Sequence, residues 1–240
     1  MQLHVDDRGH GSRTALLVHG LTGSSESWHR VVPLLVAHGY RVLAVDLPGH
    51  GRSPRDHALT IPRAARAVAA SVAGTCGTAP DVAIGHSLGG LVLAAAVELG
   101  VLHPRVTVSV DAPAGTRGGW DRDETAAEYA EERRGRTVEG LRATRPAYGE
   151  QDRVVEARAA RRFDPDTAAA LAAGPGCSFP PPPGSIVVRA DPSAYVDDDR
   201  AAGYRDRGVD VRSIPGAAHT VWYSHFDAFV AALPEVFGPS

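Results

Sequence analysis

Residues 81–99 read DVAIGHSLGGLVLAAAVEL, and this stretch decides the fold. Residues 81–84 predict a strand, and residues 91–99, apolar on nearly every side, predict a buried helix. Between them lies the pattern G-x-S-x-G, centred on Ser87. A sharp strand-to-helix turn lifts a serine hydroxyl out of the sheet, and the neighbouring glycines leave room for its strained backbone. Ser87 is therefore the predicted nucleophile.

Apolar runs and turn signals alternate along the rest of the chain. The runs at residues 14–18 and 40–45 lack polar alternation, which is typical of parallel strands covered by helices on both faces. Strands are expected at residues 14–18, 40–45, 106–110, 186–188 and 209–214, and helices at 28–38, 62–74, 198–206 and 226–233. The pattern predicts an α/β fold with a mostly parallel central sheet flanked by helices.

A serine hydroxyl is a poor nucleophile unless a base lies within hydrogen-bond reach. His219 follows the last expected strand in a loop that contains Pro215 and Gly216. Open α/β sheets place their sites at the carboxyl ends of the strands. His219 is therefore the predicted general base.

Four segments, in this order, resemble the α/β-hydrolase superfamily: VHGL at 18–21, DLPGHGRS at 46–53, GHSLG at 85–89 and PGAAH at 215–219. The resemblance covers nearly the whole chain and implies the α/β-hydrolase fold with an esterase-like serine nucleophile. It also implies an oxyanion hole formed by the backbone N–H groups of Leu21 and Leu88. Relatives that cleave epoxides or haloalkanes attack with aspartate at the turn, so Ser87 argues against those reactions.

The acid that completes such a site has two candidates. Its usual family position follows the second-last strand, but an ungapped alignment places Pro192 or Ser193 there, and Asp191 comes one or two residues early. A family variant takes its acid from the preceding strand end, where Asp111 lies. We favour Asp111, which would accept the Nδ1 proton of the histidine, and retain Asp191 as the alternative. Asp111 also has a structural interpretation, as a cap of the following turn.

Residues 112–183 differ in character from the rest of the chain. Arginines, acids and alanines occur there at helical density, with breaks at Pro146, Pro165 and Gly174, and the segment ends in a proline run. In the family, an insertion at this point forms a cap over the active site. We therefore expect a hydrolase core at residues 1–111 and 184–240 and a helical cap, or lid, at 112–183.

The expected substrate contacts come from both parts. The cap offers Trp120, Tyr129, Tyr148 and Phe163 as pocket lining, although packing of the cap onto the core explains each of them equally well. His19, Trp120 and Trp222 are the residues we single out for substrate binding. His19 has the alternative role of bracing its own loop.

The composition excludes several classes of function. The formal net charge is −3, and all 25 basic residues are arginine, which excludes a lysine Schiff base or a phosphate-loop lysine. The two cysteines lack zinc or redox spacing, and no apolar run approaches the length of about 18 residues that a membrane span needs. We expect no metal, no organic cofactor, no nucleic-acid partner and no membrane association. The start lacks a signal-peptide pattern, so a cytoplasmic location is expected, and the oligomeric state stays open.

The leading hypothesis is hydrolysis of an ester, thioester or lactone through a Ser87 acyl-enzyme, with His219 as base. The substrate is expected to be of small to medium size and largely apolar. Cleavage of a carbon–carbon bond by the same residues stays open. The alternatives are a non-hydrolytic acyltransferase, cyclase or lyase of specialised metabolism and, less favoured, an inactive ligand-binding protein.

Overall fold

The computed structural model describes residues 1–77 and 79–238. Its core is a seven-stranded sheet in the order β1-β3-β2-β4-β5-β8-β9. In that order the strands span Val5–Arg8, Tyr40–Val45, Arg13–Val18, Val82–His86, Val106–Val110, Ile186–Asp191 and Asp210–Pro215. Every pair is parallel except β1–β3. The predicted mostly parallel sheet is confirmed.

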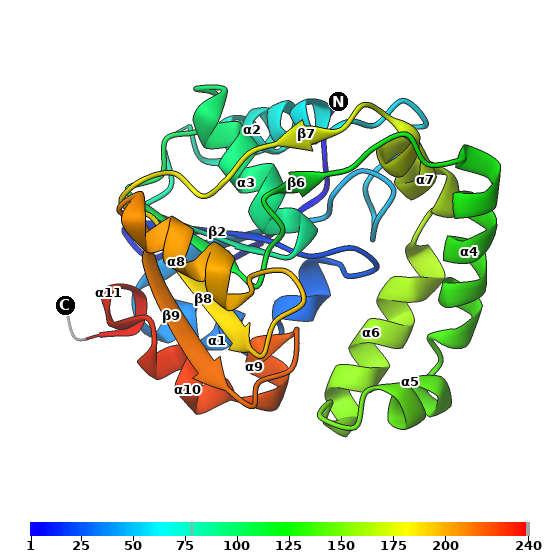
Figure 1. Cartoon of the computed structure of the whole chain (residues 1–240). Helices are drawn as coiled ribbons and strands as arrows, with labels where there is room; N and C mark the ends of the chain where they lie inside the picture. Colours follow the sequence, from blue (N-terminus) through cyan, green and yellow to red (C-terminus); the bar gives the residue numbers. More distant parts are fainter. Residues whose placement is uncertain (78, 239–240) are drawn as a thin grey trace.

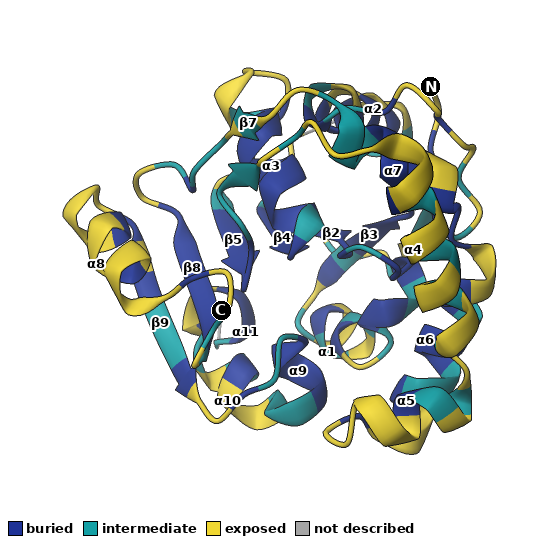
Figure 2. Ribbon diagram, turned by 45° about the vertical axis from the view of Figure 1, so that its right-hand side comes forward, coloured by how far each residue is buried: buried dark blue, intermediate teal, exposed yellow. Residues whose placement is uncertain are grey.

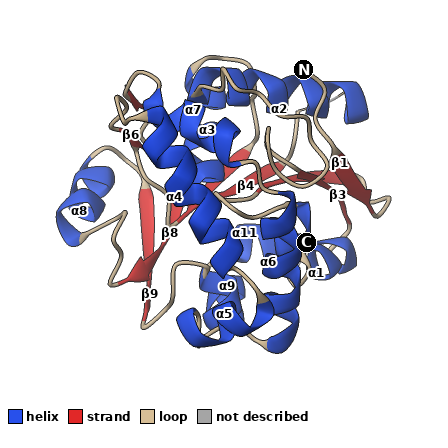
Figure 3. Ribbon diagram, turned by 90° about the vertical axis from the view of Figure 1, so that its right-hand side faces the viewer, coloured by secondary structure: helices blue, strands red, loops and turns tan. Residues whose placement is uncertain are grey.

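Helices cover both faces of this sheet (Figures 1 and 3). Alternate residues of β2 belong to different cores: Ala15 and Leu17 pack with one set of helices, and Leu16 and Val18 with the other. The first set is α1 (Val31–Ala37), α9 (Val221–Ser224), α10 (Phe226–Ala231) and α11 (Pro234–Phe237), and the second is α2 (Ile61–Cys76) and α3 (Leu88–Glu98). Side chains that alternate along a strand thus bury both faces.

Two elements near the amino end differ from the prediction. β1 has the sequence VDDR and pairs antiparallel with β3 as an edge strand. Its polar composition gives no buried-strand signal, because an edge strand faces solvent. The helix expected at 28–38 is instead a 3-10 turn, η1 (Ser25–Trp28), followed by the shorter α1.

The segment between β5 and β8 is helical and lies to one side of the sheet (Figure 1). It contains α4 (Arg122–Gly135), α5 (Val138–Thr144), α6 (Glu150–Arg162) and α7 (Pro165–Ala173). Much of the outer surface of α4 and α5 is exposed (Figure 2). The two-residue strands β6 (Gly115–Thr116) and β7 (Cys177–Ser178) pair antiparallel and bring the ends of the segment together. Sequence analysis expected no strand here, because so short a pairing leaves no periodic signal.

The remaining helix, α8 (Asp198–Asp206), packs beside β8 and β9 at the edge of the sheet. Its buried side chains are Ala201 and Tyr204. Asp197 caps its amino end, where the side chain accepts the N–H of Arg200 at 2.8 Å. Among the described residues, no helix combines the length and apolar character needed to cross a bilayer.

Candidate active site

Ser87 occupies the turn between β4 and α3 with a left-handed φ of 50° and ψ of −119°. Its N–H donates to the Val110 carbonyl at 2.9 Å, which ties the turn to β5. A Cβ on Gly89 would lie 2.2 Å from the Val18 carbonyl oxygen, so only glycine fits where α3 crosses β2. The second glycine of G-x-S-x-G is therefore required by close backbone packing.

The two amides predicted for the oxyanion hole lie on either side of this serine. Leu88 begins α3, and Leu21 follows β2 in a loop that approaches Ser87 closely: a Cβ on Gly20 would lie 3.0 Å from the Ser87 Cβ. Within residues 1–77 and 79–238, neither the Leu21 nor the Leu88 N–H donates a hydrogen bond. Both donors are thus available to a ligand.

His219 and Asp111 come together although 108 residues separate them. The imidazole Nδ1 donates to Asp111 Oδ2 at 2.7 Å. Asp111 is almost fully buried, has a φ of 44°, and its Oδ1 accepts from the Ala190 N–H at 3.2 Å and the Ser193 hydroxyl at 2.6 Å. The Ser87 hydroxyl makes no hydrogen bond with a described residue, a looseness that unliganded sites often show.

Asp191, the alternative acid, does not approach His219. Its side chain is 39% exposed and lies 3.5 Å from the Arg189 guanidinium. Arg189 in turn forms an ion pair with Asp198 at the start of α8. The Asp191 carboxylate therefore pairs with Arg189 at the carboxyl end of β8, and Asp111 is the acid that contacts the histidine.

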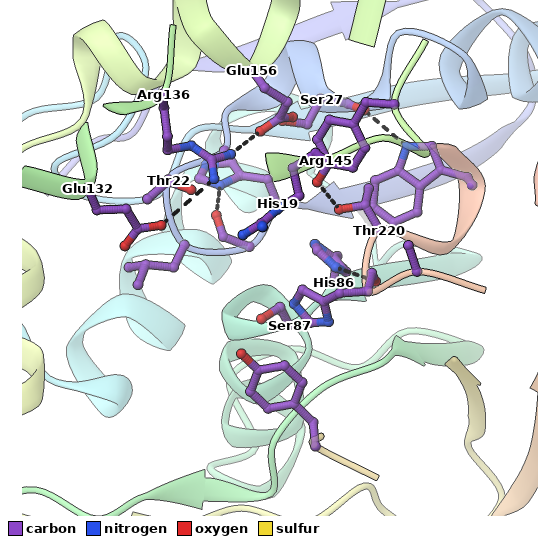
Figure 4. A pocket seen from close by; sticks show the side chains of 18 residues that line it. His19, Thr22, Ser27, His86, Ser87, Glu132, Arg136, Arg145, Glu156 and Thr220 are labelled. Atoms are coloured by element: carbon purple, nitrogen blue, oxygen red, sulfur yellow. Dashed lines mark hydrogen bonds and ion pairs between the residues drawn. The ribbon is translucent and has the colours of Figure 1, made fainter. Parts of the chain in front are cut away.

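A cavity of about 340 Å³ opens over Ser87 and His219 (Figure 4). Ser87, His219, Leu21, His19 and Trp222 all line it, as does Tyr148 from the connection between α5 and α6.

The structure does not bring Trp120 to this cavity. The indole is 53% exposed and lies beside the Arg117 guanidinium at 5.7 Å. Phe163 is buried against His50, and Tyr129 packs on Phe163. Phe163 and Tyr129 therefore pack α4 and α6 onto each other and onto the core.

His19 lines the cavity but has no ring nitrogen free for a ligand. Its Nδ1 donates to the Gly20 carbonyl at 2.7 Å, and its Nε2 accepts from the Leu47 N–H at 3.0 Å. Burial lowers the pKa of this imidazole, against smaller raising effects from Asp46 and the Gly20 bond. His19 therefore braces the loop that carries Leu21.

The wall opposite Ser87 is polar and charged (Figure 4). Buried Glu156 accepts from the Ser27 hydroxyl at 2.8 Å and the Tyr223 hydroxyl at 3.0 Å through Oε1, and from Arg136 at 3.0 Å through Oε2. Burial, followed by the charge of Glu156, raises the pKa of Tyr223 well above its usual value. Sequence analysis predicts a largely apolar substrate, whereas this wall of the cavity presents charged side chains.

One group of side chains with metal-ligand chemistry occurs away from the cavity. His57, Asp164 and Asp166 offer atoms within 4.8 Å of one another. Asp164 already caps α7 through Thr167 and lies 3.3 Å from Arg55. Helix capping and ion pairing account for this group without an ion.

Residues 15–232 match the family described as the alpha/beta hydrolase family. The chain belongs to that family. Two curated relatives are similar over part of its length. The pimeloyl-[acyl-carrier protein] methyl ester esterase of Sodalis glossinidius is 43% identical over 86 residues, which are 35% of this chain and 30% of the relative. The dihydrolipoyllysine-residue acetyltransferase component of the acetoin cleaving system of Cupriavidus necator is 40% identical over 105 residues, 43% of this chain and 26% of the relative.

This α/β-hydrolase family member thus spans less than a third of the length of each of these two relatives. Among solved structures, the esterase from Exiguobacterium antarcticum is similar over 99% of this chain and 96% of its own, with a TM-score of 0.77 at 14% identity. A likeness at that identity shows the fold. Curated relatives and structural neighbours include esterases and other hydrolases.

The α/β-hydrolase chain also holds site residues that sequence analysis did not assign. Ser193 is one of the two residues, with Pro192, that an ungapped alignment places at the usual acid position, and its hydroxyl donates to Asp111 and accepts the N–H groups of Tyr195 and Val196 at 3.0 and 2.9 Å. The Tyr195 ring lies 4.6 Å from that of His219. A hydroxyl at the family's acid position is the signal that points to Ser193.

Proposed function

We propose that this α/β-hydrolase cleaves an ester, thioester or lactone through an acyl-enzyme on Ser87. The observation that carries the proposal is the 2.7 Å bond from His219 to Asp111 at the edge of the cavity that Ser87 lines. A histidine held through Nδ1 keeps Nε2 as the proton acceptor, which is what activation of a serine requires.

The chemistry follows from these positions. His219 Nε2 removes the Ser87 proton as Oγ attacks the acyl carbon, while Asp111 stays ionised and stabilises the imidazolium. The N–H groups of Leu21 and Leu88 donate to the oxyanion, and losing one such donor typically costs about 10²–10³-fold in rate. The imidazolium then protonates the leaving group. Water, activated by the same histidine, releases the acid and restores Ser87.

Residues 112–183 act as the cap in this proposal. Glu132, Arg136, Arg145 and Glu156 line the cavity from α4, α5, α6 and their connections, so this segment supplies the far wall. The cavity volume suits a small to medium substrate. The relative named as a methyl ester esterase supports an ester as substrate.

The test is labelling with a fluorophosphonate, which reacts with activated serines. The purified protein is expected to be labelled at Ser87, located by mass spectrometry of the modified peptide, and Ser87→Ala is expected to lose the label. Ser109→Ala is a matched control because Ser109 lies buried in β5, away from the cavity. Labelling elsewhere, or no labelling of the folded protein, would contradict an activated Ser87.

A further inference from the structure

Two arginines that end consecutive helices line the cavity. Arg136 is the residue that caps the carboxyl end of α4, and Arg145 caps the carboxyl end of α5. Both guanidiniums are permanently charged and carry several N–H donors in a planar fork. A wall built this way is suited to a ligand with oxygen acceptors and negative charge.

Arg145 has donors to spare. Its side chain is exposed, its Nη1 donates to the Thr144 carbonyl at 3.1 Å, and among the described residues it forms no ion pair with a carboxylate. The turn that carries it is fixed, because the Tyr148 N–H donates to the Arg145 carbonyl and the Tyr148 hydroxyl lies 2.8 Å from the Thr220 hydroxyl. Thr220 follows the predicted base, so these contacts tie the turn that carries Arg145 to the loop of His219.

Arg136 is more deeply placed, with a side chain 11% exposed, and it is paired with two carboxylates. Its Nη2 donates to Glu156, whereas Glu132 lies 3.8 Å away, beyond hydrogen-bond distance. Its Nε is buried and has no acceptor among the described residues. A buried N–H group without an acceptor destabilises a protein.

Of the two acids that line this wall, Glu132 is paired with Arg136 at 3.8 Å, and Glu156 has little to offer a cation. Both oxygens of Glu156 already accept hydrogen bonds, from Ser27, Tyr223 and Arg136. The charges of Arg136 and Arg145 both reach the Tyr148 hydroxyl. Burial, followed by the charge of Glu156, raises the pKa of Tyr148, and the two guanidiniums oppose that rise.

We infer that the substrate carries a carboxylate at a distance from its scissile acyl group, bound by Arg145 together with Arg136. The inference rests on the proposed function and narrows it to half esters or half thioesters of dicarboxylic acids. In this arrangement Ser87 attacks one end of the acyl chain while the arginines bind the other. Charge-assisted bonds to a carboxylate are among the stronger hydrogen bonds that proteins make.

Binding is measured first, without catalysis, on Ser87→Ala. The probes are the monomethyl and dimethyl esters of succinic, glutaric and adipic acid, followed by ligand-observed NMR. For the acid of best length, the half ester is expected to bind at least about tenfold more tightly than the diester. Ser87→Ala/Arg145→Gln is expected to lose that preference, and Ser87→Ala/Arg145→Lys to keep part of it. The matched control is Ser87→Ala/Arg142→Gln, since Arg142 lies on α5 and pairs with Glu150 at the surface.

Equal binding of half ester and diester, or a preference that survives Arg145→Gln, would overturn the inference, as would absence of binding by both. Hydrolysis by the unmodified protein then separates the two proposals. Carboxylate-selective binding without turnover of any ester would refute the hydrolase and retain the recognition site. Turnover of half ester and diester at equal kcat/KM would retain the hydrolase and refute the carboxylate site.

Discussion

The two oxygens of Asp111 have different partners. Oδ2 accepts a hydrogen bond from His219 Nδ1, and Oδ1 accepts hydrogen bonds from the Ser193 hydroxyl and the Ala190 N–H. Its φ of 44° is a backbone conformation that costs on the order of 1–3 kcal/mol for a residue with a side chain. The surrounding bonds hold it there. A carboxylate so constrained keeps the imidazole in one tautomer.

Asp111→Asn is expected to reduce kcat by about 10³–10⁴-fold, because the amide no longer selects the reactive tautomer of His219. Asp191→Asn, at the exposed β8 edge, is expected to change kcat by less than about twofold. Both are measured with the best ester found after labelling, on protein whose circular dichroism matches the unmodified chain. A larger loss in Asp191→Asn would reverse the assignment of the acid.

Ser193 is a positioning residue, since it acts through Asp111. Ser193→Ala is expected to lower kcat roughly tenfold with KM within about twofold, because the missing hydroxyl frees one carboxylate oxygen. Ser193→Thr keeps the hydroxyl and should restore most of kcat. A purely structural role would predict a loss of stability with kcat unchanged in the folded fraction.

At the scale of elements, α6 is attached to η1 by a buried acid. Glu156 contacts Ser27, Tyr223 and Arg136, and its side chain is 7% exposed. Glu150, on the same helix, pairs with Arg142 at 63% exposure. A buried charge left without its partner is costly, whereas an exposed pair contributes little.

Glu156→Ala is therefore expected to lower the free energy of unfolding by about 3 kcal/mol, because it leaves Arg136 with only Glu132 at 3.8 Å and removes the acceptor of the Ser27 and Tyr223 hydroxyls. Glu150→Ala is the control, with an expected change below about 1 kcal/mol. Urea titration followed by fluorescence measures both. Similar small losses in the two variants would show that α6 does not depend on the Glu156 contacts.

The elements differ in how far the sequence reveals them. Runs rich in apolar or β-branched residues identified β2, β3, β4, β5, β8 and β9, because strands of a buried parallel sheet favour such residues. The polar β1 and the two-residue β6 and β7 carry no such signal and arise from pairing with a partner strand. The local sequence pattern likewise placed Ser87 in its turn. Whether Trp120 lines the cavity depends on how the inserted helices are oriented, which the local pattern does not determine.

Across the whole molecule, the site residues that could be predicted from the sequence are those that belong to the ordered family motifs. Ser87, His219, Leu21 and Leu88 follow from four family segments. The contact of Asp111 with His219 joins β5 to the loop after β9, and only tertiary packing establishes it. The charged wall of the cavity was not foreseen, because Arg136 and Arg145 look like other surface arginines in the sequence.

Three buried histidines, of which His19 and His86 line the cavity, give the whole molecule a pH dependence. Burial lowers the pKa of His19, of His50 to about 3, and of His86 well below its usual value. The unfolded chain, with an ordinary histidine pKa near 6.5, takes up protons first as the pH falls. The neutral histidines therefore contribute stability that is present above pH ~6.5 and is lost progressively below it.

Between pH 7.5 and 5.5 each of these histidines is expected to reduce the free energy of unfolding by no more than on the order of 1 kcal/mol, so the three together remove at most a few kcal/mol. Urea unfolding at the two pH values measures the loss. His50→Gln, which lies outside the cavity lining, is expected to remove about a third of the pH dependence whatever its effect on stability at pH 7.5. A free energy of unfolding that stays constant over this range would mean that these imidazoles are not held neutral by burial.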